Sequence, residues 1–218
     1  MLALALCSLP AMAGTLYSNL GTGTNVYNCC TGWTITGTGS IGTSFTAANE
    51  FQVTAGGNVG QIDVGVGFVE GANSFFVQID ADNNGQPGAI LATFSGLSSS
   101  TNFGSCCGLV TISGISGLNL NTGTNYWMVI GPTTTSATTW EAWNFSNSAT
   151  GIDEYAETGC ANGSSQGCVW NSNGVQPQGA FDILSGTGTG TTPEPTSLLL
   201  FGTGLVGAFG AIRRKMKL

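Results

Sequence analysis

The chain of 218 residues contains no histidine, and its only lysines and arginines are Arg213, Arg214, Lys215 and Lys217. Residues 1–212 therefore carry no cationic side chain, although they contain all eleven acidic residues. Neutralising phosphates requires Lys or Arg, so nucleic acid is excluded as a partner. Ser/His/Asp and Cys/His catalytic arrangements need an imidazole, as do histidine-ligated metal centres, so these sites are excluded as well.

The sequence is also poor in charge of either sign, with 7% charged residues against a usual ~25%. Hydrophobic residues make up 41%, which is enough for one sizeable core, and 35 residues are glycine. A solvated disordered coil, a collagen and a coiled coil are excluded by this composition. Carboxylate chemistry, calcium held by oxygen ligands, aromatic stacking on sugars and a purely structural role remain open.

Between residues 14 and 192, no stretch keeps a helical apolar period over eleven residues, and short β-rich runs alternate with Gly, Asn, Ser and Thr clusters. This pattern predicts an all-β domain over 14–185, a jelly-roll-like β-sandwich. In one run, Ile62, Val64, Val66 and Phe68 alternate and should face the core. The expected strands are 15–20, 50–54, 61–68, 75–80, 89–94, 109–113, 126–130, 139–145, 168–171 and 180–184.

The N-terminus has the features of an export signal. An apolar run over residues 1–9 ends at Pro10 and leads into Ala11-Met12-Ala13, a small-x-small pattern typical of signal-peptidase sites. We expect residues 1–13 to be a signal peptide that is cleaved after Ala13. The usual basic residues before the apolar run are missing, which indicates that this signal is truncated at its start.

The C-terminus has three parts in a fixed order. A Gly/Thr linker over 186–192 precedes Pro193-Glu194-Pro195, and an apolar run over 198–212 precedes Arg213-Arg214-Lys215. We expect residues 198–212 to form a transmembrane helix that is short for a bilayer, with the basic cluster on the cytoplasmic side.

The order and spacing of these parts resemble the PEP-CTERM sorting signal of exported bacterial proteins, over residues 193–218. The resemblance implies that an exosortase recognises and cuts the tail. It also implies export to the cell envelope, the surface or an exopolysaccharide matrix, with a transient stay in the inner membrane.

The domain itself resembles the choice-of-anchor domains that occur with such tails. The resemblance rests on Phe75-Phe76-Val77-Gln78-Ile79, on the turn Gly85-Gln86-Pro87-Gly88, on Tyr126-Trp127-Met128-Val129 and on Ala180-Phe181-Asp182-Ile183. It implies no activity.

Removal of the signal would leave six of the seven cysteines, an even number in an exported chain. We expect disulfides and no free thiol, with Cys160–Cys168 the most direct pairing because these residues enclose a short polar loop. The pairs Cys29-Cys30 and Cys106-Cys107 are adjacent, so one cysteine of each pair can meet across the fold. Zinc is a weaker alternative, because thiolate pairs that bind zinc are usually spaced as C-x₂-C.

Three groups of residues are candidate ligand sites. Asp80, Asp82 and Asn84 match the first half of a calcium loop, but Leu91 stands where a closing glutamate is needed, so we expect a hairpin turn and no metal. The exposed aromatic platform of a carbohydrate-binding site is the second candidate, and it would be formed by Trp127, Trp140, Trp143 and Trp170, with Trp33, Tyr126 and Tyr155 also available. The third is the acidic group Asp153, Glu154 and Glu157, which could hold the paired carboxylates of a glycosidase.

The sequence as a whole favours an exported structural or adhesive protein without enzymatic activity and without a cofactor. A carbohydrate-binding module for exopolysaccharide is the first alternative, because it would use exposed aromatic side chains. A glycosidase is the second alternative, because it would use two facing carboxylates.

Overall fold

Turns rich in glycine and asparagine divide the chain into short antiparallel strands, as expected from the sequence. The computed structural model describes residues 14–186. Their secondary structure comprises β1 (Thr15–Ser18), β2 (Gly32–Thr36), α1 (Thr38–Ile41), β3 (Thr46–Gln52), β4 (Gly57–Val64), β5 (Val66–Glu70), β6 (Phe75–Asp82), β7 (Pro87–Leu97), β8 (Val110–Ser113), β9 (Asn119–Leu120), β10 (Asn125–Pro132), β11 (Trp140–Ala156), β12 (Trp170–Gly179) and β13 (Phe181–Ser185). No helix within residues 14–186 is long and apolar enough to cross a membrane.

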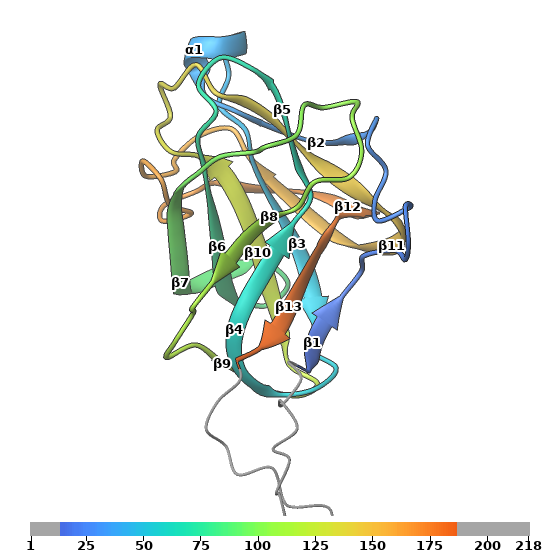
Figure 1. Cartoon of the computed structure of the whole chain (residues 1–218). Coiled ribbons are helices and arrows are strands. Elements are labelled where there is room, and N and C mark those ends of the chain that lie inside the picture. Colours follow the sequence, from blue (N-terminus) through green and yellow to red (C-terminus); the bar gives the residue numbers. More distant parts are fainter. Residues whose placement is uncertain (1–13, 187–218) are drawn as a thin grey trace, which may run out of the picture. The chain divides into compact units, whose positions relative to one another are not determined.

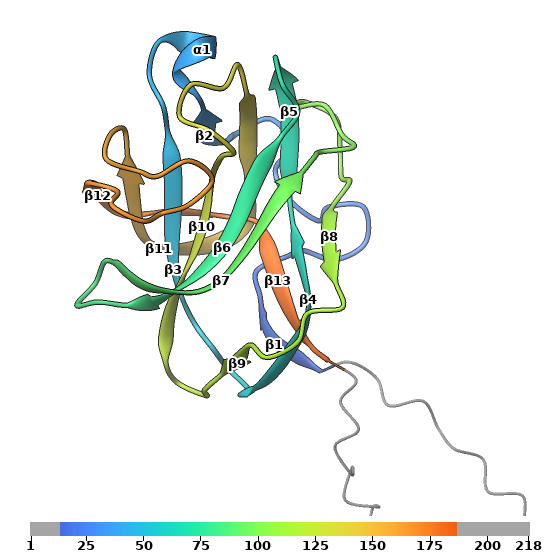
Figure 2. The same ribbon diagram turned by 90° about the vertical axis from the view of Figure 1, so that its left-hand side faces the viewer.

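The strands form two sheets (Figure 1). One has the order β1-β13-β4-β8, with β9 beside β4, and the other has the order β12-β11-β3-β10-β6-β7, with β2 and β5 beside β11. The sheets pack in a sandwich-like arrangement, which confirms the all-β prediction (Figure 2). The predicted signal peptide, the sorting tail with its transmembrane helix and the linker beyond Gly186 lie outside the described residues.

Gly65 divides the run that the sequence predicted as one strand over 61–68. Val64 pairs with Phe181 in the five-stranded sheet, whereas Val66 pairs with Trp143 in the other sheet. A Cβ at Gly65 would lie 2.9 Å from the Tyr27 ring, so a side chain does not fit at this crossing. The alternation was correct for Ile62, Val64 and Val66, which are completely buried, whereas Phe68 is half-buried.

The longest strand, β11, belongs to two parts of the larger sheet. Residues 140–144 pair with β2, and residues 140–143 pair with β5, whereas the second half of the strand pairs with β12 and β3. The sequence prediction of 139–145 captured only the first half of this strand. The second half contains Asp153 and Glu154, which are 0% and 2% exposed, so its polar composition resembled a loop although it is buried strand.

The main core lies between the two sheets and follows the alternation of strand side chains. Ile62 and Phe181 contribute from the smaller sheet, and Met128 and Trp143 contribute from the larger one. A second apolar cluster contains Phe76, Trp127 and Val129, whose side chains alternate with those of the main core along β6 and β10. The larger sheet is therefore apolar on both faces, which explains the near-continuous hydrophobic runs in β6 and β10.

A disulfide-closed loop covers part of the outer face of the larger sheet. Cys160 and Cys168 are bonded, which confirms the predicted pairing. Within the loop, the Ser165 backbone N–H donates to Gln78 Oε1 at 3.0 Å, and the Ser165 hydroxyl donates to Asp80 Oδ2 at 2.7 Å. Gln78 and Asp80 are both fully buried, so the loop supplies hydrogen-bond partners that water cannot supply at this position.

The remaining cysteines only partly match the prediction. Cys29 and Cys106 form the second disulfide, so one member of each adjacent pair does meet across the fold. The expectation of no free thiol was wrong for this structure, because Cys30 and Cys107 are unbridged. Cys30 is exposed. Cys107 lies beside Cys29, but it stays free because the Cys29 sulfur is already bonded to Cys106.

Residues 14–186 bury several carboxyl groups and contain no cation that could pair with them. Burial raises the pKa of Asp80 to about 6, that of Asp153 to about 7 and that of Glu141 to about 8. Asp182 lies opposite Asp63 in the β13–β4 pair, and burial together with this neighbouring carboxyl raises its pKa to about 7. Glu141 is completely buried, and neither of its carboxylate oxygens has a hydrogen-bond partner.

Because the pKa values of these carboxyls are raised, we predict that the domain is more stable in mild acid than in mild base. The unfolded chain loses the protons near pH 4, whereas the folded chain keeps them up to about pH 6 to 8. The native state therefore binds more protons in this window, so the free energy of unfolding falls as the pH rises through it. Thermal unfolding of the exported protein, followed by tryptophan fluorescence, should give a higher midpoint at pH 5 than at pH 8.

The variant Glu141→Gln tests whether the Glu141 carboxyl contributes to this slope, the fall in the free energy of unfolding with rising pH. At pH 5 it should differ little from the parent, because the parent side chain is then protonated and neutral. At pH 8 it should be more stable by at least about 1.4 kcal/mol, the equivalent of one pKa unit. Glu70→Gln, at an exposed position in β5, is the matched control and should not change the slope. A midpoint that is constant or rises between pH 5 and pH 8 would show that the prediction is wrong.

Candidate functional site

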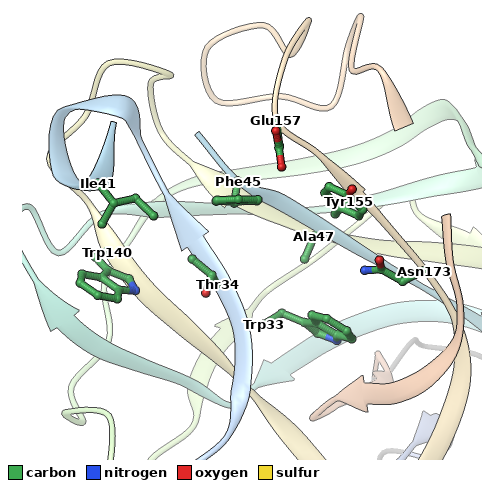
Figure 3. Close-up of a pocket in the computed structure, with 9 residues that line it drawn as sticks. All are labelled: Trp33, Thr34, Ile41, Phe45, Ala47, Trp140, Tyr155, Glu157 and Asn173. Atoms are coloured by element: carbon green, nitrogen blue, oxygen red, sulfur yellow. The ribbon is translucent and has the colours of Figure 1, made fainter. Parts of the chain in front are cut away.

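An aromatic groove of about 410 Å³ opens on the larger sheet, where residues on or next to β2, β3, β11 and β12 line it (Figure 3). Its lining residues are Trp33, Thr34, Ile41, Phe45, Ala47, Trp140, Tyr155, Glu157 and Asn173. Four of these nine side chains are aromatic. In both overall views, α1 lies at the end of the sandwich opposite to the ends of β1 and β13 (Figures 1 and 2). The two ends of the described chain, which adjoin β1 and β13, therefore lie at the opposite end of the sandwich from α1, whose last residue lines the groove.

Trp33 is held rigidly by three contacts. Its strand, β2, pairs with β11 so that Trp33 lies opposite Trp143. The indole Nε1–H donates to the Pro177 carbonyl at 3.1 Å, and the ring packs edge-on against Phe145 with centroids 5.0 Å apart. Because the indole N–H is already used, the exposed part of the ring offers an apolar surface to a ligand.

The other aromatic rings of the groove come from the ends of β3 and β11. Phe45 and Tyr155 lie next to each other, with ring centroids 6.4 Å apart and planes inclined by 38°. Trp140 begins β11 and pairs with Thr36 and with Glu70 on the two flanking strands. All three aromatic side chains are half-buried, so they combine a fixed position with a solvent-accessible face.

The lining also includes three polar side chains, Thr34, Glu157 and Asn173. Asn173 Nδ2 donates to Asp153 Oδ2 at 2.7 Å, and Asn49 Nδ2 donates to Asp153 Oδ1 at 2.7 Å. Asn49 in turn accepts a hydrogen bond from the Gly179 N–H at 2.7 Å. This network fixes Asn173 from below, because its central members Asn49 and Asp153 are completely buried.

The structure places only one of the four predicted platform tryptophans, Trp140, in the groove. Trp127 and Trp143 are completely buried, so they cannot contact a sugar, and this part of the prediction was wrong. The Trp127 indole donates to Asp82 Oδ1 at 2.9 Å, while Trp143 fills the main core. Trp170 is half-buried and packs against the Trp127 cluster on the other side of the sheet.

Of the additional aromatic candidates, Trp33 and Tyr155 line the groove, whereas Tyr126 belongs to the main core. Sequence reasoning missed Phe45, Ile41 and Asn173. The alternation in Gly32-Trp33-Thr34-Ile35-Thr36 could have revealed β2 and the position of Trp33.

The acidic group does not converge on one site. Asp153 is buried beneath Asn173, and Glu154 is 2% exposed at the next position of the strand, so their side chains point to opposite faces. Of the three acids, only Glu157 lines the groove. The arrangement lacks the facing carboxylates that the glycosidase hypothesis requires.

The calcium-like segment forms the β6–β7 hairpin, as expected. Asp80 lies beneath the Cys160–Cys168 loop, where it accepts the Ser165 hydrogen bond. The Asp82 carboxylate accepts from the Gly85 N–H at 3.0 Å in addition to the Trp127 indole. Asn84 adopts a positive φ of 57°, a conformation that asparagine tolerates in turns.

Comparison with known families gives a match in the C-terminal tail, outside the domain that contains the groove. The family model for the PEP-CTERM protein-sorting motif matches residues 191–215. The chain carries a PEP-CTERM sorting tail. The matched residues include Pro193-Glu194-Pro195 and Arg213-Arg214-Lys215, which confirms the tail predicted from the sequence. No curated protein matches the chain.

The tail implies export, sorting by an exosortase and association with the envelope or surface. The resemblance of the domain to choice-of-anchor domains stays a prediction, because the match lies outside the domain.

The network beneath the groove predicts that Asn49→Ala strongly destabilises the domain. The substitution would leave the Gly179 N–H without its acceptor and would remove one of two donors from the buried Asp153 carboxyl. Unsatisfied buried groups cost about 1 to 3 kcal/mol each, so we expect the loss to lie in this range or above it. Denaturant unfolding would measure it. Asn119→Ala is the control, because that side chain is exposed and bonds only Asn58. Equal stability of the two variants would contradict the prediction.

Proposed function

We propose that this protein is a non-enzymatic adhesive component of the cell surface or extracellular matrix, and that it adheres by binding polysaccharide in the aromatic groove. The observation that carries the proposal is the grouping of four aromatic side chains, Trp33, Phe45, Trp140 and Tyr155, around one groove that also has polar side chains in its lining. Apolar walls with a few placed polar groups are typical of ligand sites. Sugar rings suit such a groove because their faces are apolar and their edges carry hydroxyls.

The charge of the domain restricts the class of sugar. Residues 14–186 contain ten acidic residues and no Lys, Arg or His, and one of these acids, Glu157, lines the groove. Uronic acids and sulfated sugars would therefore be repelled, because no cation is present to pair with them. We propose a neutral polysaccharide or one that carries amino groups, with Asn173 and Glu157 as the polar partners.

The proposal includes no catalysis. Hydrolysis of a glycosidic bond requires an acid and a second carboxyl on the two sides of the bond. In the groove described here, Glu157 is the only carboxylate, and Asp153 is already bonded to Asn49 and Asn173. Binding without cleavage fits an adhesive protein.

Affinity electrophoresis of the exported protein would test this function. Gels would contain a neutral glucan, a partly deacetylated aminoglycan or an alginate at matched concentrations. We expect retardation in one or both of the first two gels and none in alginate. Trp140→Ala should weaken binding at least about tenfold, which corresponds to 1.4 kcal/mol, because it removes one wall of the groove.

Trp170→Ala is the matched control, because it removes a half-buried tryptophan that lies outside the groove. It should leave binding unchanged. Equal retardation of the parent and Trp140→Ala would place the sugar elsewhere. Retardation by alginate alone would contradict the charge argument, and no retardation in any gel would leave only a structural role.

The tail predicts that the mature protein is shorter than the full chain. If the tail is a sorting signal, the protein should end near Pro193-Glu194-Pro195, because the sorting motif that begins there implies processing by an exosortase. Intact-mass measurement of the protein from its host checks this, with a host lacking its exosortase as the control. A mature species that still carries Arg213 to Leu218 would show that the tail is a permanent anchor.

A further inference from the structure

Three sulfur atoms gather where the segment before β2 meets the segment before β8. The Sγ atoms of Cys29, Cys106 and Cys107 all lie within 4.8 Å of one another. Cys29 and Cys106 form a disulfide, and the free Cys107 Sγ lies 3.4 Å from Cys29 Sγ. We propose that this cluster is a thiol–disulfide exchange site, in which Cys106 and Cys107 alternate as the partner of Cys29.

The exchange needs no external oxidant or reductant. The Cys107 thiol loses its proton to solvent, and the resulting thiolate attacks Cys29 Sγ. The Cys29–Cys107 bond forms as the Cys29–Cys106 bond breaks, and the electron pair leaves on Cys106 Sγ, which then takes a proton from solvent. One disulfide and one thiol are present before and after the step, so the number of electrons and protons is unchanged.

The surroundings of the three residues favour this direction of attack. Cys29 is 5% exposed, and Cys107 is half-buried, with its thiol 3.7 Å from the Thr24 carbonyl oxygen. Cys106 is exposed, so water can stabilise the departing thiolate. Exchange would therefore move the free thiol from a sheltered position to the protein surface.

Other hydrogen bonds hold the two segments together whichever disulfide is present. The Gly104 N–H donates to the Cys29 carbonyl at 2.8 Å, and the Tyr27 hydroxyl donates to the Gly108 carbonyl at 2.8 Å. The Tyr27 side chain is 1% exposed and packs against Gly65. These contacts on both sides of the cluster keep the sulfur atoms close, so exchange does not require the segments to separate.

Cys30 provides an internal comparison, because it is the other free cysteine in the described residues but does not belong to the cluster. Its side chain is exposed, and its backbone N–H is bonded to Asn28 Oδ1 at 3.0 Å. A reagent that alkylates thiols should label Cys30 fully under all conditions.

The test maps free thiols in the exported protein at the level of single residues. The protein is incubated at pH 8, alkylated with N-ethylmaleimide, digested with pepsin in acid and fragmented in a mass spectrometer. Pepsin is needed because residues 1–212 contain no Lys or Arg for trypsin. We expect one equivalent of label shared between Cys106 and Cys107, with at least about a tenth on Cys106, and no label on Cys29.

Two variants separate exchange from a fixed cross-link. In Cys106→Ser, a peptide pair linked through Cys29 and Cys107 should appear. In Cys107→Ser, Cys106 should stay bonded to Cys29 and unlabelled. Cys30→Ser is the control and should leave the division of label between Cys106 and Cys107 unchanged.

Label confined to Cys107 in the parent protein would overturn the proposal. Alkylation of both Cys29 and Cys107 in Cys106→Ser would overturn it as well. The measurement on the parent protein decides the question without any variant, should Cys106→Ser fail to fold.

Discussion

Residues 14–186 must accommodate ten carboxyl groups without a single cation, and much of the structure follows from this constraint. Buried charges normally pair with opposite charges or shift their pKa to become neutral. Here amides and hydroxyls replace the missing cations. Asn49 and Asn173 donate to Asp153, and Ser165 donates to Asp80. These bonds join β3 to β11, β12 to β11, and the disulfide loop to β6. Asp153 and Asp80 therefore hold separate segments together, whereas Glu141, which has no hydrogen-bond partner, relies on its raised pKa to stay neutral.

Both halves of β11 contribute to the groove, through Trp140 and Tyr155, and the two halves pair with different strands. Its first half lies between β2 and β5, and its second half lies between β12 and β3. Trp33 on β2 and Tyr155 near the end of β11 line the opening. The hydrogen bond from Trp33 to the Pro177 carbonyl joins β2 to β12, so Trp33 is held in place in the wall of the groove.

The sequence predicted the strands with long apolar runs and missed short strands such as β2 and strand segments that are rich in polar residues. The apolar runs of β6 and β10 were found because both faces of their sheet are buried. The second half of β11 was missed because Asp153 and Glu154 are typical of loops, and their burial depends on partners such as Asn49 that are distant in sequence. The same limit applies to the groove. Trp140 and Trp143 are identical in type, and only the register of β11 decides that one lines the groove while the other is core.

Sorting by the tail and the proposed adhesion make different demands on charge, and the charged residues that concern them lie in different segments. Arg213, Arg214 and Lys215 lie within the matched sorting motif, whereas residues 14–186 have only negative charge. A domain of this charge gains nothing from electrostatic attraction to acidic polymers, so any adhesion must come from apolar contact and hydrogen bonding. The aromatic groove offers both. The side of the groove formed by α1 lies at the end of the sandwich remote from Gly186, after which the tail follows in the sequence (Figure 1). Attachment through one end of the domain would therefore leave the other end free to bind.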